Sequence, residues 1–350
     1  APAAAPAPAG APRRKGSNGT TTLSPAEVAA QEACPTVRLL DDWAEPGGTP
    51  CKIGSTFGCQ APHGQGMFAK DGCTGVFSVS SKVTACGGKY KSTCTPGDLP
   101  RPTSTCDIMI LTSFFTTKKD WQRGRKTRGS FAKISKLYQS VLELGLRVSV
   151  IYDFLPPDLV RDYSCDNFQF VQVSLDDFNR RYGVNDVRYY FFLRLVEQNP
   201  GWKTIFIVDA FDVVIRMNPC PGVRDGLIYV GHERDRLKKH PWMAARFKKM
   251  GGKYLQFYQQ KVTPNMKILN CGLTGGRRDM MLKLLKRMCE VLKDPAINIM
   301  GKDEDINLNM AALNYILYME FANKFTGNAP MHSQYKRFET KRRDVWFVHK

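Results

Sequence analysis

The 350-residue sequence predicts an α/β domain, with a mostly parallel sheet and flanking helices, preceded by a small Cys-rich all-β module. Two observations carry this prediction. Seven of the 11 cysteines lie before residue 107, and after Cys106 apolar strand patterns alternate with helical ones. We therefore divide the chain into a disordered Ala/Pro-rich stalk or linker (1–33), a disulfide-stapled β module (34–105) and an α/β domain (106–350).

The first segment is rich in Ala, Pro and Gly and poor in the aromatic and branched side chains that build a core. It suits a stem that follows a membrane anchor, and a cloning remnant is the alternative. The triplet Asn18-Gly19-Thr20 is an N-glycosylation acceptor.

The cysteines of the second segment favour disulfides over a zinc site, because their spacings are irregular and no C-x-x-C sequence occurs. Disulfides indicate the lumen of the secretory pathway (Golgi or ER) or secretion. No apolar run reaches the roughly 18 residues of a membrane span, so we expect membrane contact only through an anchor upstream of this sequence. The module either binds glycans or serves as a packing spacer.

In the third segment we expect strands at 107–112, 147–152, 168–173, 204–208, 226–231 and 344–348. We expect helices at 129–145, 187–198, 238–258, 277–293 and 304–320. The run 204–208 is continuously apolar, which predicts a central strand buried on both faces.

Asp209 and Asp212 follow this central strand directly. Ligands of open α/β sheets collect at the carboxyl ends of strands, and a sharp turn would bring the two carboxylates to one side. They would repel each other there unless they shared a cation. A turn or helix-capping role is the alternative for an isolated D-x-x-D sequence.

Four further segments carry a resemblance in their order along the chain. They are Asp186-Val187-Arg188 before an aromatic run, Asn270-Cys271-Gly272 in a glycine-rich turn (269–276), Ala311-Ala312-Leu313-Asn314 on a helix, and Phe347-Val348-His349 on a closing strand. With Asp209 and Asp212, they resemble GT-A glycosyltransferases, which have a Rossmann-like fold. The resemblance is greatest to the glycosyltransferase domain of procollagen lysyl hydroxylases and related eukaryotic and algal enzymes, and it covers residues from 106 to the end.

The resemblance implies a hexose transfer from a nucleotide-sugar donor, UDP-linked in our expectation, to a hydroxyl of a glycan or glycoprotein. It implies Mn²⁺, or Mg²⁺, held by Asp209, Asp212 and His349, since carboxylate oxygens with one imidazole suit such an ion. The donor would contact a further set of residues: Thr112, Ser113, Arg188, Phe211, Asn270, Gly272 and Lys350. Arg188 either contacts the diphosphate or pairs with an acid near the metal.

Catalytic roles would fall to Asp305, Asn309 and Asn314. Asn309 departs from the family, which often has an acid there, although Asp303 and Glu304 lie just upstream. This departure leaves open whether the anomeric configuration is retained or inverted, and it allows a glycan-binding pseudoenzyme as an alternative.

The formal net charge of +19 favours anionic ligands. One basic cluster follows the first strand (118–128), where a diphosphate would lie, and a second runs from Arg234 to Lys253 and suits an acceptor, an anionic polymer or a solvated helix face. A polyanion- or nucleic-acid-binding protein is therefore the rival function. We expect no nucleic-acid partner, because the cysteines are dense and no recognisable nucleic-acid motif occurs.

Overall fold

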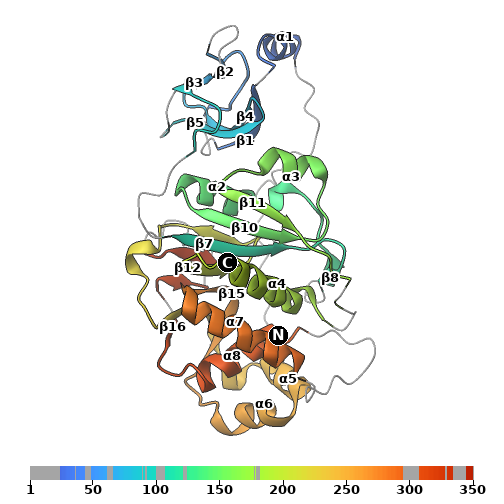
Figure 1. Ribbon diagram of the computed structural model, residues 1–350, viewed down its shortest axis with the longest axis vertical. Coiled ribbons are helices and arrows are strands. Elements are labelled where there is room, and N and C mark those ends of the chain that lie inside the picture. The colour runs from blue at the N-terminus through green and yellow to red at the C-terminus, as the bar shows by residue number, and fades with distance from the viewer. Residues whose placement is uncertain are drawn as a thin grey trace, which may run out of the picture.

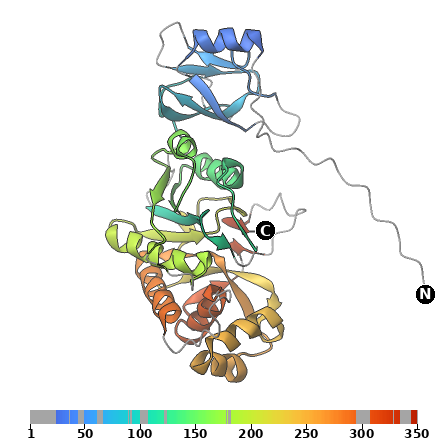
Figure 2. The ribbon, with the colours of Figure 1, turned by 90° about the vertical axis from the view of Figure 1, so that its right-hand side faces the viewer.

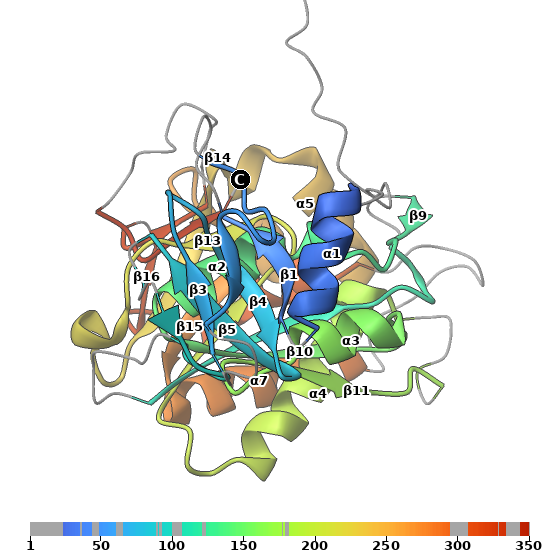
Figure 3. The same cartoon turned by 90° about the horizontal axis from the view of Figure 1, so that it is seen from above.

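The computed structural model describes residues 24–349 except 36, 44–48, 61–65, 89, 91–92, 100–106, 121–123, 177, 179–181, 295–306, 328 and 334–343. The β module stacks on one end of the α/β part, and α5 (Pro241–Met250) and α6 (Gly252–Gln256) lie at the opposite end (Figure 1 and Figure 2). Seen from above, the module lies over α2 (Ser135–Glu143) and the main sheet (Figure 3).

Helix α1 (Pro25–Ala33) lies within the segment expected to be disordered, and it corrects that expectation for its last nine residues. The Ser24 side chain accepts a hydrogen bond from the Glu27 amide, and the Glu27 carboxylate accepts one from the Ser24 amide at 2.9 Å. This capping box satisfies amides that the first turn leaves unpaired. Ala30 anchors the helix on the core of the β module.

Among its described residues, the β module contains two three-stranded sheets and three disulfides. One sheet has β1 (Val37–Asp42), β4 (Thr74–Val79) and β5 (Lys82–Gly87), and the other has β2 (Phe57–Cys59), β3 (Met67–Ala69) and β6 (Thr93–Cys94). The disulfides are Cys34–Cys59, Cys51–Cys73 and Cys86–Cys94, which confirms the disulfide interpretation. Each contributes about 2–4 kcal/mol by restricting the unfolded chain.

The module packs against the α/β part through buried apolar and polar contacts. Trp43 joins the cluster that contains the core side chains of α2. Arg38 forms a 2.6 Å ion pair with Asp162, and the Tyr163 hydroxyl donates to the Leu40 carbonyl at 2.9 Å. These contacts tie β1 to α3 (Pro157–Tyr163).

The main sheet has seven strands in the order β11-β10-β7-β12-β15-β14-β16. Six run in one direction and β15 opposes them, which confirms a mostly parallel α/β sheet. The strands are β7 (Ile108–Phe114), β10 (Arg147–Tyr152), β11 (Phe168–Gln172), β12 (Thr204–Val208), β14 (Ile228–Arg236), β15 (Lys267–Arg277) and β16 (Phe325–Gly327). The direction of strand addition reverses between β7 and β12, where this architecture opens a crevice for ligands.

Successive side chains of β12 point to opposite faces of the sheet and pack in two separate layers of the core. Ile205 and Ile207 pack in the cluster with α4 and α7, whereas Phe206 and Val208 pack in the cluster with α2. The helices of the α/β part are α2 (Ser135–Glu143), α3, α4 (Val184–Gln198), α5 (Pro241–Met250), α6 (Gly252–Gln256), α7 (Arg278–Lys293) and α8 (Asn309–Met319). Both faces of the central strand are therefore covered, as its apolar run predicts.

Several expected element boundaries differ in the structure. The helix expected at 238–258 is divided into α5 and α6 at Gly251, whose φ of 62° is left-handed. The stretch 129–145 opens with a 3₁₀ turn, Phe131–Lys133, before α2, and 304–320 is helical from Asn309 among the described residues. The last expected strand, 344–348, is observed as β18 (Phe347–His349). In the described part of the chain, no helix has the length and apolarity of a membrane span.

The segment 269–276 was expected to be a turn, and the structure corrects this, because it lies within the antiparallel strand β15. Its glycines serve close packing. A Cβ at Gly275 would lie 2.5 Å from Cε1 of Phe206, and one at Gly276 would lie 2.7 Å from the Leu227 carbonyl oxygen. Glycine inside a strand marks such close approaches as well as turns.

We predict that Gly275→Ala destabilises the chain by about 1–3 kcal/mol, because the added methyl group would overlap the Phe206 ring in a closely packed layer. Thermal unfolding would measure the loss. Gly201→Ala is the matched control, since no atom lies within 4 Å of a Cβ built there. Equal unfolding midpoints for the two variants would contradict the packing role of Gly275.

Candidate metal centre and cavity

Asp209 and Asp212 lie at the carboxyl end of β12, beside the reversal in strand order. The Thr112 hydroxyl on β7 donates to the Val208 carbonyl at 2.7 Å, and the Asp209 amide donates to the Gly272 carbonyl at 2.9 Å. The end of β12 is thus held from both neighbouring strands, and the position of the Asp209 carboxylate follows from the sheet itself.

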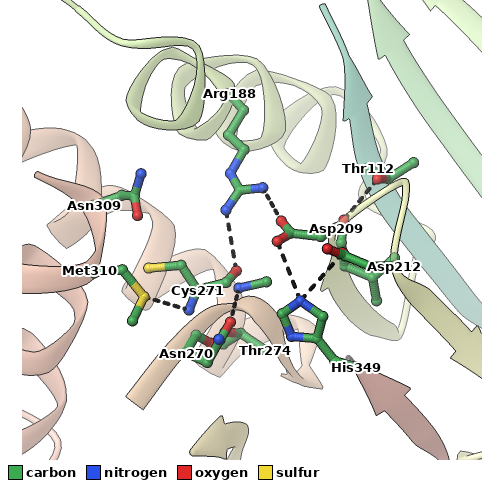
Figure 4. A network of polar contacts seen from close by, with 12 residues as sticks. Thr112, Arg188, Asp209, Asp212, Asn270, Cys271, Thr274, Asn309, Met310 and His349 are labelled. Carbon is green, nitrogen blue, oxygen red and sulfur yellow. Dashed lines mark hydrogen bonds and ion pairs between the residues drawn. The ribbon is translucent and has the colours of Figure 1, made fainter. Parts of the chain in front are cut away.

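His349 reaches the two carboxylates through a second, three-stranded sheet of β13 (Val213–Ile215), β18 and β17 (Met331–His332). Strands β13 and β18 are antiparallel, and Val213 pairs with His349. Because Val213 directly follows Asp212, this register places the imidazole beside both acids. His349 Nε2 lies 3.6 Å from Asp209 Oδ2 and 3.4 Å from Asp212 Oδ1 (Figure 4).

This arrangement fits a metal ion. The candidate ligand atoms of Asp209, Asp212 and His349 lie within 4.8 Å of one another. The imidazole is only 2% exposed, and within the described part of the chain neither of its nitrogens makes a hydrogen bond. A buried ring nitrogen without such a bond normally has a reason. Two carboxylates and one imidazole are a donor set that a divalent cation accepts.

Arg188 of α4 pairs with an acid of this cluster, which is one of the two roles expected for it, and it also lines the cavity described below. Its Nη1 lies 2.5 Å from Asp209 Oδ1, and its Nη2 donates to the Cys271 carbonyl at 3.4 Å. Burial raises the pKa of Asp209, but the guanidinium, with help from His349, outweighs burial and holds the pKa below its usual value. Asp209 is therefore ionised at neutral pH.

A bulge in β15 brings the backbone close to the cluster. The β14–β15 register passes from Val230↔Thr274 to Gly231↔Asn270, which leaves residues 271–273 without partners on β14. The Asn270 side chain accepts from the Gly272 amide at 2.6 Å and donates to Glu233. Bulges of this kind often lie beside functional sites.

Gly272 lies at the tip of this bulge, against the candidate metal ligands. A Cβ there would come within 2.6 Å of Asp209 Cγ and 2.7 Å of His349 Cε1. Any side chain at this position would displace one of the two candidate ligands, so only glycine fits there.

A cavity of about 630 Å³ opens beside the cluster, a size typical of small-molecule sites. Eight residues singled out in the sequence line it: Ser113, Arg188, Asp209, Phe211, Asn270, Gly272, Asn309 and His349. Thr112 does not line it, since this side chain is buried and bonded to the end of β12. Asp305 and Lys350 lie outside the described residues.

Asn309 and Asn314 hold α8 in place. The side-chain nitrogen Nδ2 of Asn309 donates to Asp186 Oδ1 at 3.0 Å and to Asn307 Oδ1 at 2.7 Å. The Asn314 side chain bonds both the amide and the carbonyl of Leu269 at 2.9 Å. Asn314 is fully buried and does not line the cavity, so its position supports a structural role in place of the expected catalytic one.

The cavity residues that were not singled out in the sequence include Asp120, Glu233, Asp235 and His240. Trp242 also lines the cavity, but it belongs to the second basic cluster, for which an acceptor surface was one expectation. Glu233 could have been found, because it follows the apolar run of β14 at the carboxyl end of a strand parallel to β12, the same signal that marks Asp209. The expected phosphate-facing cations of the 118–128 loop do not line this cavity in its described part; Asp120 does.

The sequence matches no known protein family, and no curated protein shows significant similarity to it. Among solved structures, one similar chain is a glycosyltransferase involved in the glycosylation of the major capsid of PBCV-1. It is 13% identical, with a TM-score of 0.33, and the match covers 70% of this chain and 92% of that one. A likeness of this degree bears on neither the reaction nor the substrate of this chain.

Asp186, which is fully buried, accepts hydrogen bonds from the amides of Leu308 and Asn309 at the start of α8. Burial raises its pKa to about 7, although these hydrogen bonds and Arg188 oppose the rise. The folded protein therefore binds a proton that the unfolded chain releases near the usual value of 3.8, so this stabilising contribution is lost as pH rises from about 4 to 7.

We predict that the unfolding free energy of the wild type, relative to Asp186→Asn, is higher at pH 5 than at pH 7.5. Denaturant unfolding without added metal would measure both proteins at both pH values. Asp166→Asn, at an exposed position, is the control and should show no such trend. A wild-type advantage that grows with pH would contradict the raised pKa.

Proposed function

We propose that the chain is a metal-dependent glycosyltransferase that transfers a hexose from a nucleotide-sugar donor to a hydroxyl of a glycan or glycoprotein. The observation that supports this best is the Asp209, Asp212 and His349 cluster at the strand-order reversal, beside a cavity large enough for a small molecule. The sequence resemblance to GT-A enzymes suggests the same reaction. Within this proposal, residues 106–350 are the catalytic domain.

The three side chains would hold Mn²⁺, or Mg²⁺, as in the sequence-based interpretation. Such an ion neutralises the negative charge that develops on a departing diphosphate. Arg188 keeps Asp209 ionised and oriented, so the carboxylate is ready to bind a cation without a proton having to leave. Gly272 keeps the backbone clear of both Asp209 and His349.

The donor would lie along the carboxyl ends of β7 and β12. Phe211 lines the cavity and is braced edge-on by Phe114, with ring centroids 5.0 Å apart, so a flat face can meet a nucleobase or ribose. Ser113 offers a hydroxyl on the same side. UDP remains our proposal for the nucleotide, and the secretory lumen or exterior, which the disulfides suit, for the location.

The acceptor would enter from the side of β14. Its hydroxyl must lose a proton as the new C–O bond forms and the bond to the diphosphate breaks, and a carboxylate next to it can take that proton. Glu233 lines the cavity and is held by the Asn270 amide, so we assign it this role if the configuration is inverted. Asn309, whose amide hydrogens bind Asp186 and Asn307, is not suited to it.

We predict that Asp212→Ala lowers Mn²⁺ affinity at least about 100-fold and abolishes donor hydrolysis while the fold persists, because it removes a charged ligand from a polar site. Calorimetric titration with Mn²⁺ measures the first effect, and UDP-sugar hydrolysis measures the second.

Asp166→Ala is the matched control, since it removes an exposed carboxylate elsewhere on the α/β domain. It should bind Mn²⁺ as the wild type does. Wild-type Mn²⁺ affinity in Asp212→Ala, with an unchanged unfolding midpoint, would show that this carboxylate is not a metal ligand.

A further inference from the structure

Half of the net charge of the chain is concentrated in one stretch, residues 234–267, which we call the basic segment. It contains ten Lys and Arg residues and one acid, Asp235, so its net charge is +9 of the total +19. The cations are Arg234, Arg236, Lys238, Lys239, Arg246, Lys248, Lys249, Lys253, Lys261 and Lys267. Such a concentration favours an anionic partner.

The basic segment runs from the end of β14 through α5 and α6 to β15, and it contributes part of the wall of the cavity. Asp235, His240 and Trp242 line the cavity, while the residues on either side of Asp235 are exposed arginines. The Arg246 guanidinium lies over the Trp242 ring, 4.8 Å from its centroid. The basic segment therefore borders the same cavity that the proposed acceptor would enter.

Some of these cations have partners and others have no counter-charge among the residues that the structure describes. Lys253 pairs with Asp294 at 3.0 Å, and Lys238 donates to the carbonyl of Gln259 at 2.8 Å. In the described part of the chain, the exposed Lys239 and Lys248 form no ion pair. Unpaired cations that lie close together repel one another and destabilise the folded chain. A contribution to stability therefore does not explain the positive charge of the basic segment.

The cavity itself carries the opposite charge. Glu233 and Asp235 of β14 line it, together with Asp120 of β8 (Lys119–Asp120), so an anionic group would be repelled by these carboxylates and attracted to the basic segment. A sugar hydroxyl suits the interior, because carboxylates accept its hydrogen bond. Trp242 is partly exposed and lines the cavity, so the part of its ring that Arg246 leaves uncovered can pack against a sugar ring.

We infer that the acceptor of the proposed transferase is an anionic glycan, bearing carboxylates or sulfates, that lies along the basic segment and places a hydroxyl in the cavity. This inference rests on the proposed function. A glycan suits the carboxylates of the cavity better than a nucleic acid does, because each of its rings carries several hydroxyls from which carboxylates can accept hydrogen bonds. It also suits the oxidising compartment that the three disulfides indicate.

Binding of a labelled hexameric oligogalacturonate to the full chain, measured by fluorescence anisotropy at two salt concentrations, tests the inference. We expect the binding to weaken as the salt concentration rises. The double variant Lys239→Glu/Lys248→Glu should bind about tenfold more weakly, since the reversed charges on the basic segment repel the ligand. Maltohexaose, which is neutral and of equal length, should bind at least about tenfold more weakly than the oligogalacturonate.

The control variant is Lys133→Glu/Lys136→Glu, which makes the same charge change at exposed positions near α2, on the other side of the sheet. It should bind like the wild type, and unfolding midpoints would verify that both variants fold. Equal losses in the two variants, or equal binding of maltohexaose, would overturn the inference. Tighter binding of single-stranded DNA, with the same dependence on Lys239 and Lys248, would overturn it in favour of a nucleic-acid partner.

A parallel measurement separates this inference from the proposed function. Thermal stabilisation of the wild type by UDP with Mn²⁺ reports on the donor site alone. If UDP with Mn²⁺ stabilises the chain and oligogalacturonate does not bind, the acceptor class is wrong and the transferase proposal stands. If no Mn²⁺-dependent stabilisation by UDP occurs, the donor proposal fails whatever the glycan does.

Discussion

The ion pair between the buried Arg188 and the partly exposed Asp209 is the interaction around which the α/β part is organised. An arginine that is 4% exposed costs several kcal/mol to bury unless an anion lies against it. Asp209 supplies that anion from the end of β12, and the Cys271 carbonyl on the bulge of β15 takes a second contact. These contacts link helix α4 to strands β12 and β15. The other two candidate metal ligands, Asp212 and His349, lie next to them.

The Arg188–Asp209 ion pair also explains how several charged side chains can lie close together at the end of the sheet. Asp209 and Asp212 repel each other, and Arg188 compensates one of them on the side of α4. His349 approaches from the opposite side, on a different sheet. A divalent cation would complete this balance, because the candidate ligand atoms of the three side chains already lie within 4.8 Å of one another.

Much of this arrangement could be predicted from the sequence, because its signals are local. The apolar run of β12 and the acids that follow it indicate a central strand ending at a ligand site, and the alternating strand and helix patterns indicate the layers. The glycine-rich stretch was misinterpreted, since glycine marks both turns and close strand packing, and only the position of Phe206 distinguishes the two. The functions of Asn309 and Asn314 were equally hidden, because their partners lie far away in the sequence.

His349 could be assigned as a ligand only through the family resemblance. The way in which it reaches the two acids also determines when the site forms. Its position is set by the pairing of β18 with β13, whose partners Val213 and His349 are 136 residues apart in the chain. Contacts of such long range carry a large loop-closure entropy and form late in folding. The three candidate ligands are therefore brought together only when nearly the whole domain has folded, so metal binding at the proposed site would report the completion of folding. Partly folded chains would lack the site, however much of their sheet and helices had already formed.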